Sequence, residues 1–260
     1  MSSNLKSNNP KTKGRMASAT AGTEDVEIKV TVANSKERDA ASVFGLDPQK
    51  AEQRYIYFFD TVKLGLSDKG VILRAREIRG GKEDSTVKIR PVDPSRVPPN
   101  WFRMEGFKIE ADGVGDRMIR SASLCVEQHR GEVKEVASHK RGINKLFSPD
   151  QEEFLSEMST MRVDFDSLAI LGPVDARRWK VTHPGLIYGI TAEEWLLPNG
   201  RDLLELSIKA PTAQAAAASA AFHGFLGELG FQPQGGQQTK TRIALEYFAK
   251  QVKVKLPTAS

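Results

Sequence analysis

Several short stretches of this chain alternate apolar and charged residues with a period of two. In EDVEIKV (24–30), three aliphatic residues alternate with Asp25, Glu27 and Lys29. The same alternation returns in GVILRAREI (70–78), TVKIRP (86–91), RRWKV (177–181) and LLELSIK (203–209). A period of two indicates β-strands that have one apolar face and one charged face.

Other segments complete the predicted order of elements. Strands are also expected at 54–61 and 101–112, and a hairpin at 187–211 that turns at Asn199-Gly200. Helices are expected at 116–128, at 148–158 with Ser148 as N-cap, at 212–230 and at 239–250. The chain therefore combines strands and helices in an α+β arrangement.

The charged strand faces can look either at water or at the interior. In a single strand, a charged face simply faces solvent. Here several strands share the pattern, and helices are available to cover the aliphatic faces. An antiparallel sheet closed on itself, with helices packed outside, would enclose a lumen lined by both signs of charge.

Length and composition fit one soluble domain: 260 residues, 39% apolar and 27% charged. The expected division is a disordered tail at 1–23, one domain at 24–252 with a helical insertion at about 113–175, and a flexible tail at 253–260. No apolar run is long enough to span a membrane, and the single Cys125 excludes an internal disulfide. A cytoplasmic protein without a membrane partner is therefore expected.

The charges of the predicted lumen indicate a class of ligand. Buried like charges are costly without partners, so such a lumen suits a highly charged ligand. Arginine and lysine bind phosphate oxygens, whereas carboxylates repel phosphate and instead suit Mg²⁺ or Mn²⁺. The net charge of +5 fits an anionic partner, but the excess of cations is too small to indicate nucleic acid.

The sequence also resembles a known family. DVEIK is similar to the E-x-E-x-K signature of the CYTH superfamily, the triphosphate tunnel metalloenzymes. YFFDT, LRAR, TVKIR, LLELSIK and QQTKTRIALEYF follow in the order expected for that family. The resemblance covers roughly residues 25–250. It implies a closed eight-stranded antiparallel β-barrel, called the tunnel, with helices packed outside.

The resemblance also implies roles for individual residues. Catalytic roles fall to Glu27, Glu205 and Lys240. Metal ligands would be Asp25, Glu27, Glu110, Glu194 and Glu205, with Glu105 as the alternative to Glu110 and with Glu193 as the alternative to Glu194. Phosphates would be bound by Lys29, Arg74, Arg76, Lys88, Arg90, Arg178, Lys180 and Lys240. Lys209 shares the phase of Glu205 but lies near a strand end.

Structural roles are expected for three other conspicuous residues. Asp60 lies at a strand end before a turn, where a carboxylate commonly caps local structure. Trp179 and Trp195 could stack on a base, but β alternation favours the core for both.

The function that follows is metal-dependent hydrolysis of a small triphosphate compound, with inorganic tripolyphosphate expected first and Mg²⁺ or Mn²⁺ as cofactor. Two alternatives stay open. One is an adenylate cyclase that makes cyclic AMP from ATP, and the other is a non-catalytic polyphosphate-binding module. The protein is expected to be a monomer or a homodimer.

Overall fold

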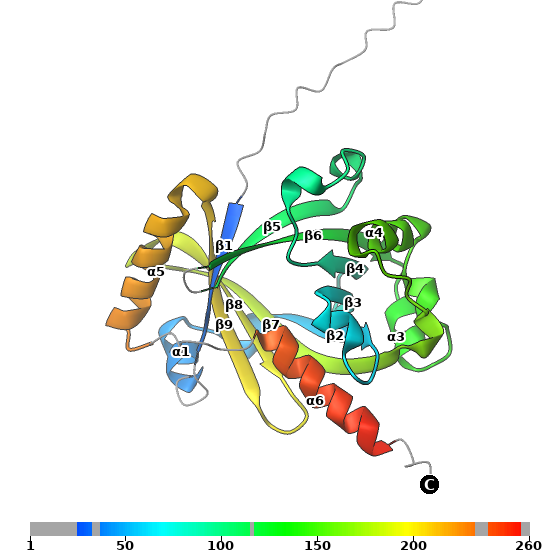
Figure 1. The fold of residues 1–260 in the computed structure, drawn as a ribbon. Coiled ribbons are helices and arrows are strands. Elements are labelled where there is room, and N and C mark those ends of the chain that lie inside the picture. Colours follow the sequence, from blue (N-terminus) through cyan, green and yellow to red (C-terminus); the bar gives the residue numbers. More distant parts are fainter. Residues whose placement is uncertain (1–24, 33–36, 115–116, 232–238, 256–260) are drawn as a thin grey trace, which may run out of the picture.

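A closed barrel of nine strands forms the centre of the described part of the molecule (Figure 1). The computed structural model describes residues 25–32, 37–114, 117–231 and 239–255, so the tail expected at 1–23 lies outside the described residues. The strands are β1 Asp25–Thr31, β2 Glu52–Asp60, β3 Val71–Ile78, β4 Glu83–Ile89, β5 Phe107–Val114, β6 Arg117–Gln128, β7 Ala169–His183, β8 Leu186–Leu196 and β9 Asp202–Pro211. Around the barrel they follow the order β1-β5-β6-β4-β3-β2-β7-β8-β9.

The expected eight-stranded antiparallel barrel is wrong in two linked ways. The barrel has nine strands, and β1 pairs with β5 in parallel through Val26 and Ala111, while every other neighbouring pair is antiparallel. A closed ring in which all neighbours run antiparallel needs an even number of strands. The odd ninth strand therefore requires a parallel pair.

The strand that sequence reasoning missed is β6. The segment 116–128 was expected to be a helix, but Arg117–Gln128 pairs with β5 on one edge and with β4 on the other. Its alternation is visible from Ala122 through Leu124 to Val126, although serines and alanines dilute it. Pairing along both edges decides the local structure here and overrides weak local propensity.

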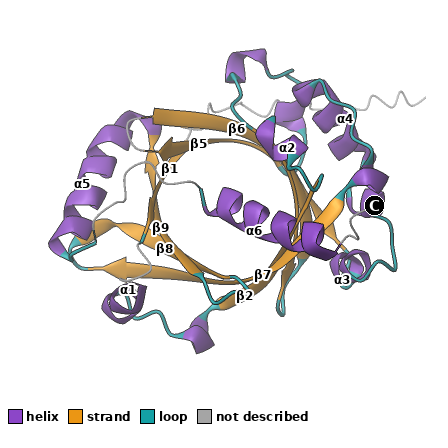
Figure 2. Ribbon diagram, turned by 60° about the horizontal axis from the view of Figure 1, so that its bottom comes forward, coloured by secondary structure: helices purple, strands orange, loops and turns teal. Residues whose placement is uncertain are grey.

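Helices cover the outside of the barrel and one of its openings. They are α1 Glu37–Val43, α2 Gly65–Asp68, α3 Glu132–Ala137, α4 Pro149–Ser159, α5 Ala215–Glu228 and α6 Lys240–Lys255. Figure 2 shows α5 and α1 on one side, α3 and α4 on another, and α6 lying across the opening. The helices expected near 148–158, 212–230 and 239–250 are confirmed as α4, α5 and α6. α6 continues to Lys255, past the expected start of the tail at 253.

The apolar core lies mainly between the barrel and these outer helices. Val26, Ile28 and Val30 of β1 are at most 4% exposed and belong to the same cluster as Phe222 and Phe225 of α5. A second cluster joins β3, β4 and β6 to α3 and α4, and a third lies under α6. Because the aliphatic faces point outward, the charged faces of the same strands point inward. Among the described residues, no helix is long and apolar enough to cross a membrane.

Candidate active site

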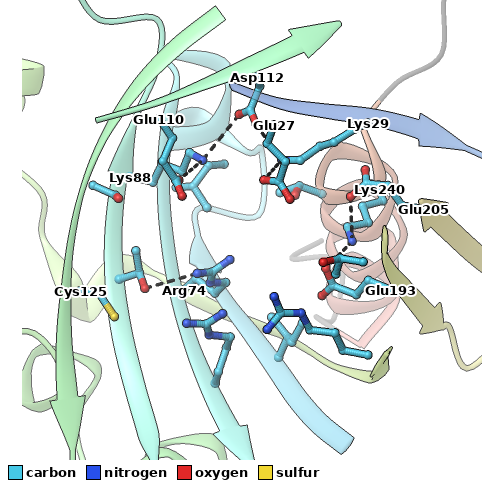
Figure 3. Close-up of a pocket in the computed structure, with 18 of the residues that line it drawn as sticks. Glu27, Lys29, Arg74, Lys88, Glu110, Asp112, Cys125, Glu193, Glu205 and Lys240 are labelled. Atoms are coloured by element: carbon cyan, nitrogen blue, oxygen red, sulfur yellow. Dashed lines mark hydrogen bonds and ion pairs between the residues drawn. The ribbon is translucent and has the colours of Figure 1, made fainter. Parts of the chain in front are cut away.

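The barrel encloses a cavity of about 350 Å³ lined by charged side chains (Figure 3). Ten of the residues expected at the site line it: Glu27, Lys29, Arg74, Arg76, Lys88, Arg90, Glu110, Arg178, Glu205 and Lys240. They come from β1, β3, β5, β7 and β9, from the end of β4, and from the first turn of α6. Strand phase therefore predicted most of the charged side chains of the cavity wall. Of the alternatives left open, Glu110 lines the cavity and Glu105 is exposed elsewhere.

Three expected site residues do not line this cavity. Asp25 is the first residue of β1, and its side chain is exposed. Lys180 is exposed because β2 pairs with β7 only as far as Arg178, so Lys180 lies past the end of its neighbour. Glu194 points away from the lumen and pairs with Arg177, whose Nη1 lies 3.3 Å from Glu194 Oε2. Glu193 takes the place in the lumen that Glu194 was expected to fill.

Several lining residues were not expected. Asp112 follows Glu110 in the same phase of β5, so the alternation that selected Glu110 could have found it. Arg54 is 7% exposed and lines the cavity from β2, where apolar residues on both strand faces hide the phase. Thr86 and Cys125 were missed for different reasons: Thr86 carries no charge, and Cys125 lies on the strand mistaken for a helix.

The structural roles expected for Asp60 and Trp179 are confirmed. The Asp60 carboxylate accepts backbone N–H bonds from Thr61, Leu66 and Ser67 at 2.7–2.9 Å, and it thereby anchors α2 to the end of β2. Trp179 packs in the cluster under α5. Trp195 is 2% exposed and belongs to the core, but it also lines the cavity.

One group of lining residues combines two lysines with three carboxylates. Lys29 Nζ lies 2.6 Å from Asp112 Oδ1 and 3.1 Å from Glu27 Oε2, and Lys88 Nζ lies 3.2 Å from Glu110 Oε2. Burial alone would lower the pKa of Lys29, but the surrounding carboxylates outweigh it and hold that pKa above its usual range. Burial likewise raises the pKa of Asp112, yet Lys29 and Lys88 pull it below its usual range.

A second group joins α6 to the barrel. Lys240 Nζ lies 2.7 Å from Glu193 Oε2, 3.0 Å from Glu205 Oε1 and 4.8 Å from the centre of the Trp195 ring. Trp195 Nε1 donates a hydrogen bond to Glu193 Oε1 at 3.0 Å. Burial would raise the pKa of Glu193, but Lys240 outweighs burial and holds this pKa well below its usual range. One ammonium thus holds two carboxylates together.

The arginines of the cavity are less well paired. Arg76 binds both oxygens of Asp84 at 2.7–3.0 Å. Among the described residues, Arg74 has only a long contact of 3.4 Å from Nη2 to Thr86, and its Nε is buried without a hydrogen-bond partner. Burial and neighbouring Arg76 lower the pKa of Arg74 to about 10, so the side chain still carries its charge at neutral pH. Within the described residues, Arg90 and Arg178 form no ion pair.

Comparison with known proteins agrees with this architecture. No protein-family model and no curated protein matches the chain. Among solved structures, a "putative adenylate cyclase" from Bacillus halodurans matches with a TM-score of 0.58 and 13% identity, over 84% of this chain and 96% of that one. The "putative adenylyl cyclase HpAC1" from Hippeastrum matches with a TM-score of 0.56 and 15% identity, over 85% of this chain and 94% of that one. That protein is described as having a dominant triphosphatase activity.

The barrel shares the fold of these two solved structures. At these identities the likeness shows a shared fold, and it confirms at the level of fold the resemblance seen in the sequence. It carries no conclusion about activity.

The carboxylates of this charged cavity are suited to hard divalent cations. Among the described residues, no three His, Cys, Asp or Glu side chains converge as a preformed metal site. Instead, Glu193 and Glu205 converge in a pair on Lys240, and Glu27 and Asp112 converge on Lys29. Mg²⁺ is commonly bound by one or two carboxylates together with water and substrate phosphates. The donor set therefore fits a cation that enters with a phosphate ligand.

Proposed function

We propose that this protein is a metal-dependent hydrolase of triphosphate compounds, with inorganic tripolyphosphate as its preferred substrate. The observation that carries the proposal is Arg74, whose Nε is buried in the lumen without a hydrogen-bond partner and which forms no ion pair among the described residues. An unpaired buried cation is costly, so its retention is best explained by an anionic ligand. Arg90 and Arg178 offer two more cations to the same ligand.

Three lysines of the cavity wall would help to neutralise and position the triphosphate. Lys29, Lys88 and Lys240 can turn from their carboxylates to phosphate oxygens, because each carries a flexible ammonium with three donors. Fixed cations of this kind stabilise charge that develops as the terminal phosphoryl group is transferred to water. Positioning and electrostatics suffice for this chemistry, and no covalent nucleophile is required.

Mg²⁺ or Mn²⁺ is the proposed cofactor. Glu27 and Glu205 are the proposed ligands, and Glu193, Glu110 and Asp112 are further carboxylates within the tunnel. When bound, the metal would neutralise phosphate oxygens and polarise the phosphorus centre.

Trp195 bears on the choice between tripolyphosphate and ATP. Its indole ring lines the cavity. Lys240 lies over this ring, however, and Glu193 accepts a hydrogen bond from the indole N–H. A base could stack on it only after this contact breaks. The lining cations instead suit a chain of phosphates without an attached nucleoside, and the triphosphatase activity described for the Hippeastrum protein is consistent with this choice.

A phosphate-release assay tests the proposal. The purified protein is incubated with Mg²⁺ or Mn²⁺ and with tripolyphosphate, thiamine triphosphate, ATP or pyrophosphate. We expect kcat/KM for tripolyphosphate to equal or exceed that for ATP and to exceed that for pyrophosphate by far, because pyrophosphate leaves part of the cation set unpaired. Cyclic AMP as the main product from ATP would instead support a cyclase. Binding of tripolyphosphate without turnover would leave a polyphosphate-binding module.

A further inference from the structure

One thiol lies in the tunnel wall and has no part in the proposed hydrolysis. Cys125, the single cysteine of the chain, lines the cavity from β6. Cys125 is opposite Thr86 of β4, and Thr86 is opposite Arg74 of β3. The three side chains therefore form one row across neighbouring strands, and Figure 3 shows Cys125 and Arg74 on the same side of the cavity.

The surroundings of this thiol favour anions. Arg74 has a buried Nε without a hydrogen-bond partner and no acid within ion-pair distance in the described residues. Arg76 lies two residues further along the same face of β3, although Asp84 already binds it. An unneutralised cation inside a low-dielectric cavity raises the local concentration of anions, and with it the rate at which an anionic reagent meets the thiol.

We propose that Cys125 is a modification site, at which small disulfides that carry carboxylates form a mixed disulfide and close the tunnel to phosphates. Peptide disulfides of the glutathione class have this chemistry. Their carboxylates would lie beside Arg74, in the place that we assign to phosphate oxygens. The site itself depends only on the cavity and its charges, whereas the loss of turnover rests on the proposed function.

The reaction is an ordinary thiol–disulfide exchange. The Cys125 thiol releases its proton to water, and the thiolate attacks one sulfur of the reagent R–S–S–R. A new S–S bond joins Cys125 to one half of the reagent, the original S–S bond breaks, and the other half leaves as R–S⁻. The sulfur of Cys125 is oxidised and the departing thiolate is reduced, so no further oxidant is needed. An added thiol reverses the step.

The first experiment measures which reagent the thiol prefers. The full-length protein is treated with dianionic dithiobis(nitrobenzoate) and with neutral dithiodipyridine, and both rates are followed by absorbance. The matched control is Cys125→Ser combined with Ser42→Cys, which places the only thiol on the exposed surface of α1. We expect the ratio of anionic to neutral rates to be about 10-fold higher for the wild type than for the control. Arg74→Gln should lose most of that preference, and added salt should reduce it.

The second experiment tests whether tripolyphosphate binds next to Cys125 and blocks access to its thiol. Tripolyphosphate without metal should slow modification of Cys125 by about 10-fold or more at saturation and leave the surface control unaffected. Modified wild-type protein should lose turnover of tripolyphosphate and regain it with added thiol, while Cys125→Ser should keep its own untreated rate throughout.

The outcomes separate this inference from the proposed function. Three results would each overturn the inference. They are an equal ratio of anionic to neutral rates in wild type and control, a Cys125 thiol that reacts with neither reagent, and full turnover by the modified protein. Protection by tripolyphosphate in a protein that never hydrolyses it would support the site at Cys125 and refute the hydrolase. Hydrolysis of tripolyphosphate without any protection of Cys125 would support the hydrolase and refute the site at Cys125.

Discussion

At the scale of single residues, the tunnel combines charges that are neutralised with charges that are not. Lys29, Lys88 and Lys240 each contact carboxylates, so the lumen is not simply a positive surface. Arg74 differs from these lysines, because its Nε is buried without a hydrogen-bond partner and the one hydrogen bond it forms within the described part of the chain is the long contact to Thr86. Breaking an ion pair of the first kind leaves a buried charge uncompensated and destabilises the fold, whereas a charge of the second kind already costs stability and is useful only to a ligand.

Arg74→Gln should therefore separate binding from stability. We expect KM for tripolyphosphate to rise roughly 10- to 150-fold, which corresponds to about 1.5–3 kcal/mol for hydrogen bonds to a charged group. The free energy of unfolding should stay the same or increase, because burial of an unpaired charge is relieved. Arg76→Gln is the comparison: it should lower stability, since it leaves the Asp84 carboxylate without its partner. A stability loss in Arg74→Gln as large as that in Arg76→Gln would contradict this division.

Glu193 should make stability depend on pH. The pKa of its carboxyl is lowered in the folded protein because Lys240 outweighs the effect of burial. A depressed carboxyl pKa stabilises the fold fully above the unfolded value near ~4.3, and this stabilisation is lost as pH falls towards the folded pKa. Glu193→Gln should thus reduce the free energy of unfolding by ~1–3 kcal/mol at pH 7, and the difference from wild type should shrink in acid.

The adjacent residue supplies a control for this pH effect. Burial raises the pKa of Glu194, despite the opposing effect of Arg177, so its ionised form does not stabilise the fold at neutral pH. We expect Glu194→Gln to leave the free energy of unfolding within ~0.5 kcal/mol of wild type or to increase it. Urea unfolding at neutral and acidic pH measures both variants. Equal losses of unfolding free energy in Glu193→Gln and Glu194→Gln would mean that Lys240 does not specifically stabilise the ionised form of Glu193.

At the scale of elements, alternation alone predicted most strands. It also predicted which face of each strand points into the lumen. It succeeded where one face is strictly aliphatic, as in β1, which carries Glu27 and Lys29. It failed for Arg54, whose strand is apolar on both faces, and for β6, where small residues weaken the pattern. The side chains that a misassigned strand contributes cannot be found by phase, which is why Cys125 was missed as a tunnel residue.

Helix α4 shows how an outer element is fixed to this barrel. Gln151 is fully buried, and its amide nitrogen donates to the carbonyl oxygens of Ser85 on β4 and Leu124 on β6 at 3.1 and 3.0 Å. Its oxygen accepts a hydrogen bond from Ser85 Oγ and another from the backbone N–H of Ser148, which closes the capping box. One side chain thus caps its helix and joins it to two strands.

Gln151→Ala should cost more stability than loss of the cap alone. It removes two hydrogen bonds to strand carbonyls and the packing volume of a buried side chain, so we expect about 2–3 kcal/mol of destabilisation in urea unfolding. Ser148→Ala removes only the cap and should cost about 1 kcal/mol. If the two variants lost equal stability, the bonds from Gln151 to β4 and β6 would contribute nothing beyond the cap.

At the scale of the whole molecule, closure of the barrel decides two properties that no single segment reveals. The odd number of strands requires the parallel β1–β5 pair, and closure brings Glu27 of β1 beside Asp112 of β5. Sequence reasoning anticipated a closed charged lumen because helices were available to cover the aliphatic faces. It could not supply the ninth strand or this pairing, because both depend on contacts between segments far apart in the chain.

Ligand binding and turnover should be separable at the level of the whole tunnel. Without metal, tripolyphosphate should raise the melting temperature more than pyrophosphate does, because it engages more of the lining cations; at a concentration of 100 Kd the gain is about 2.7 kcal/mol. Glu27→Gln should keep this stabilisation, since it removes a proposed metal ligand and no cation, and it should abolish turnover when Mg²⁺ or Mn²⁺ is present. Scanning calorimetry and phosphate release measure the two effects on the same preparations. If Glu27→Gln lost the stabilisation by tripolyphosphate, or kept near wild-type turnover at low metal, Glu27 would not have the role assigned to it here.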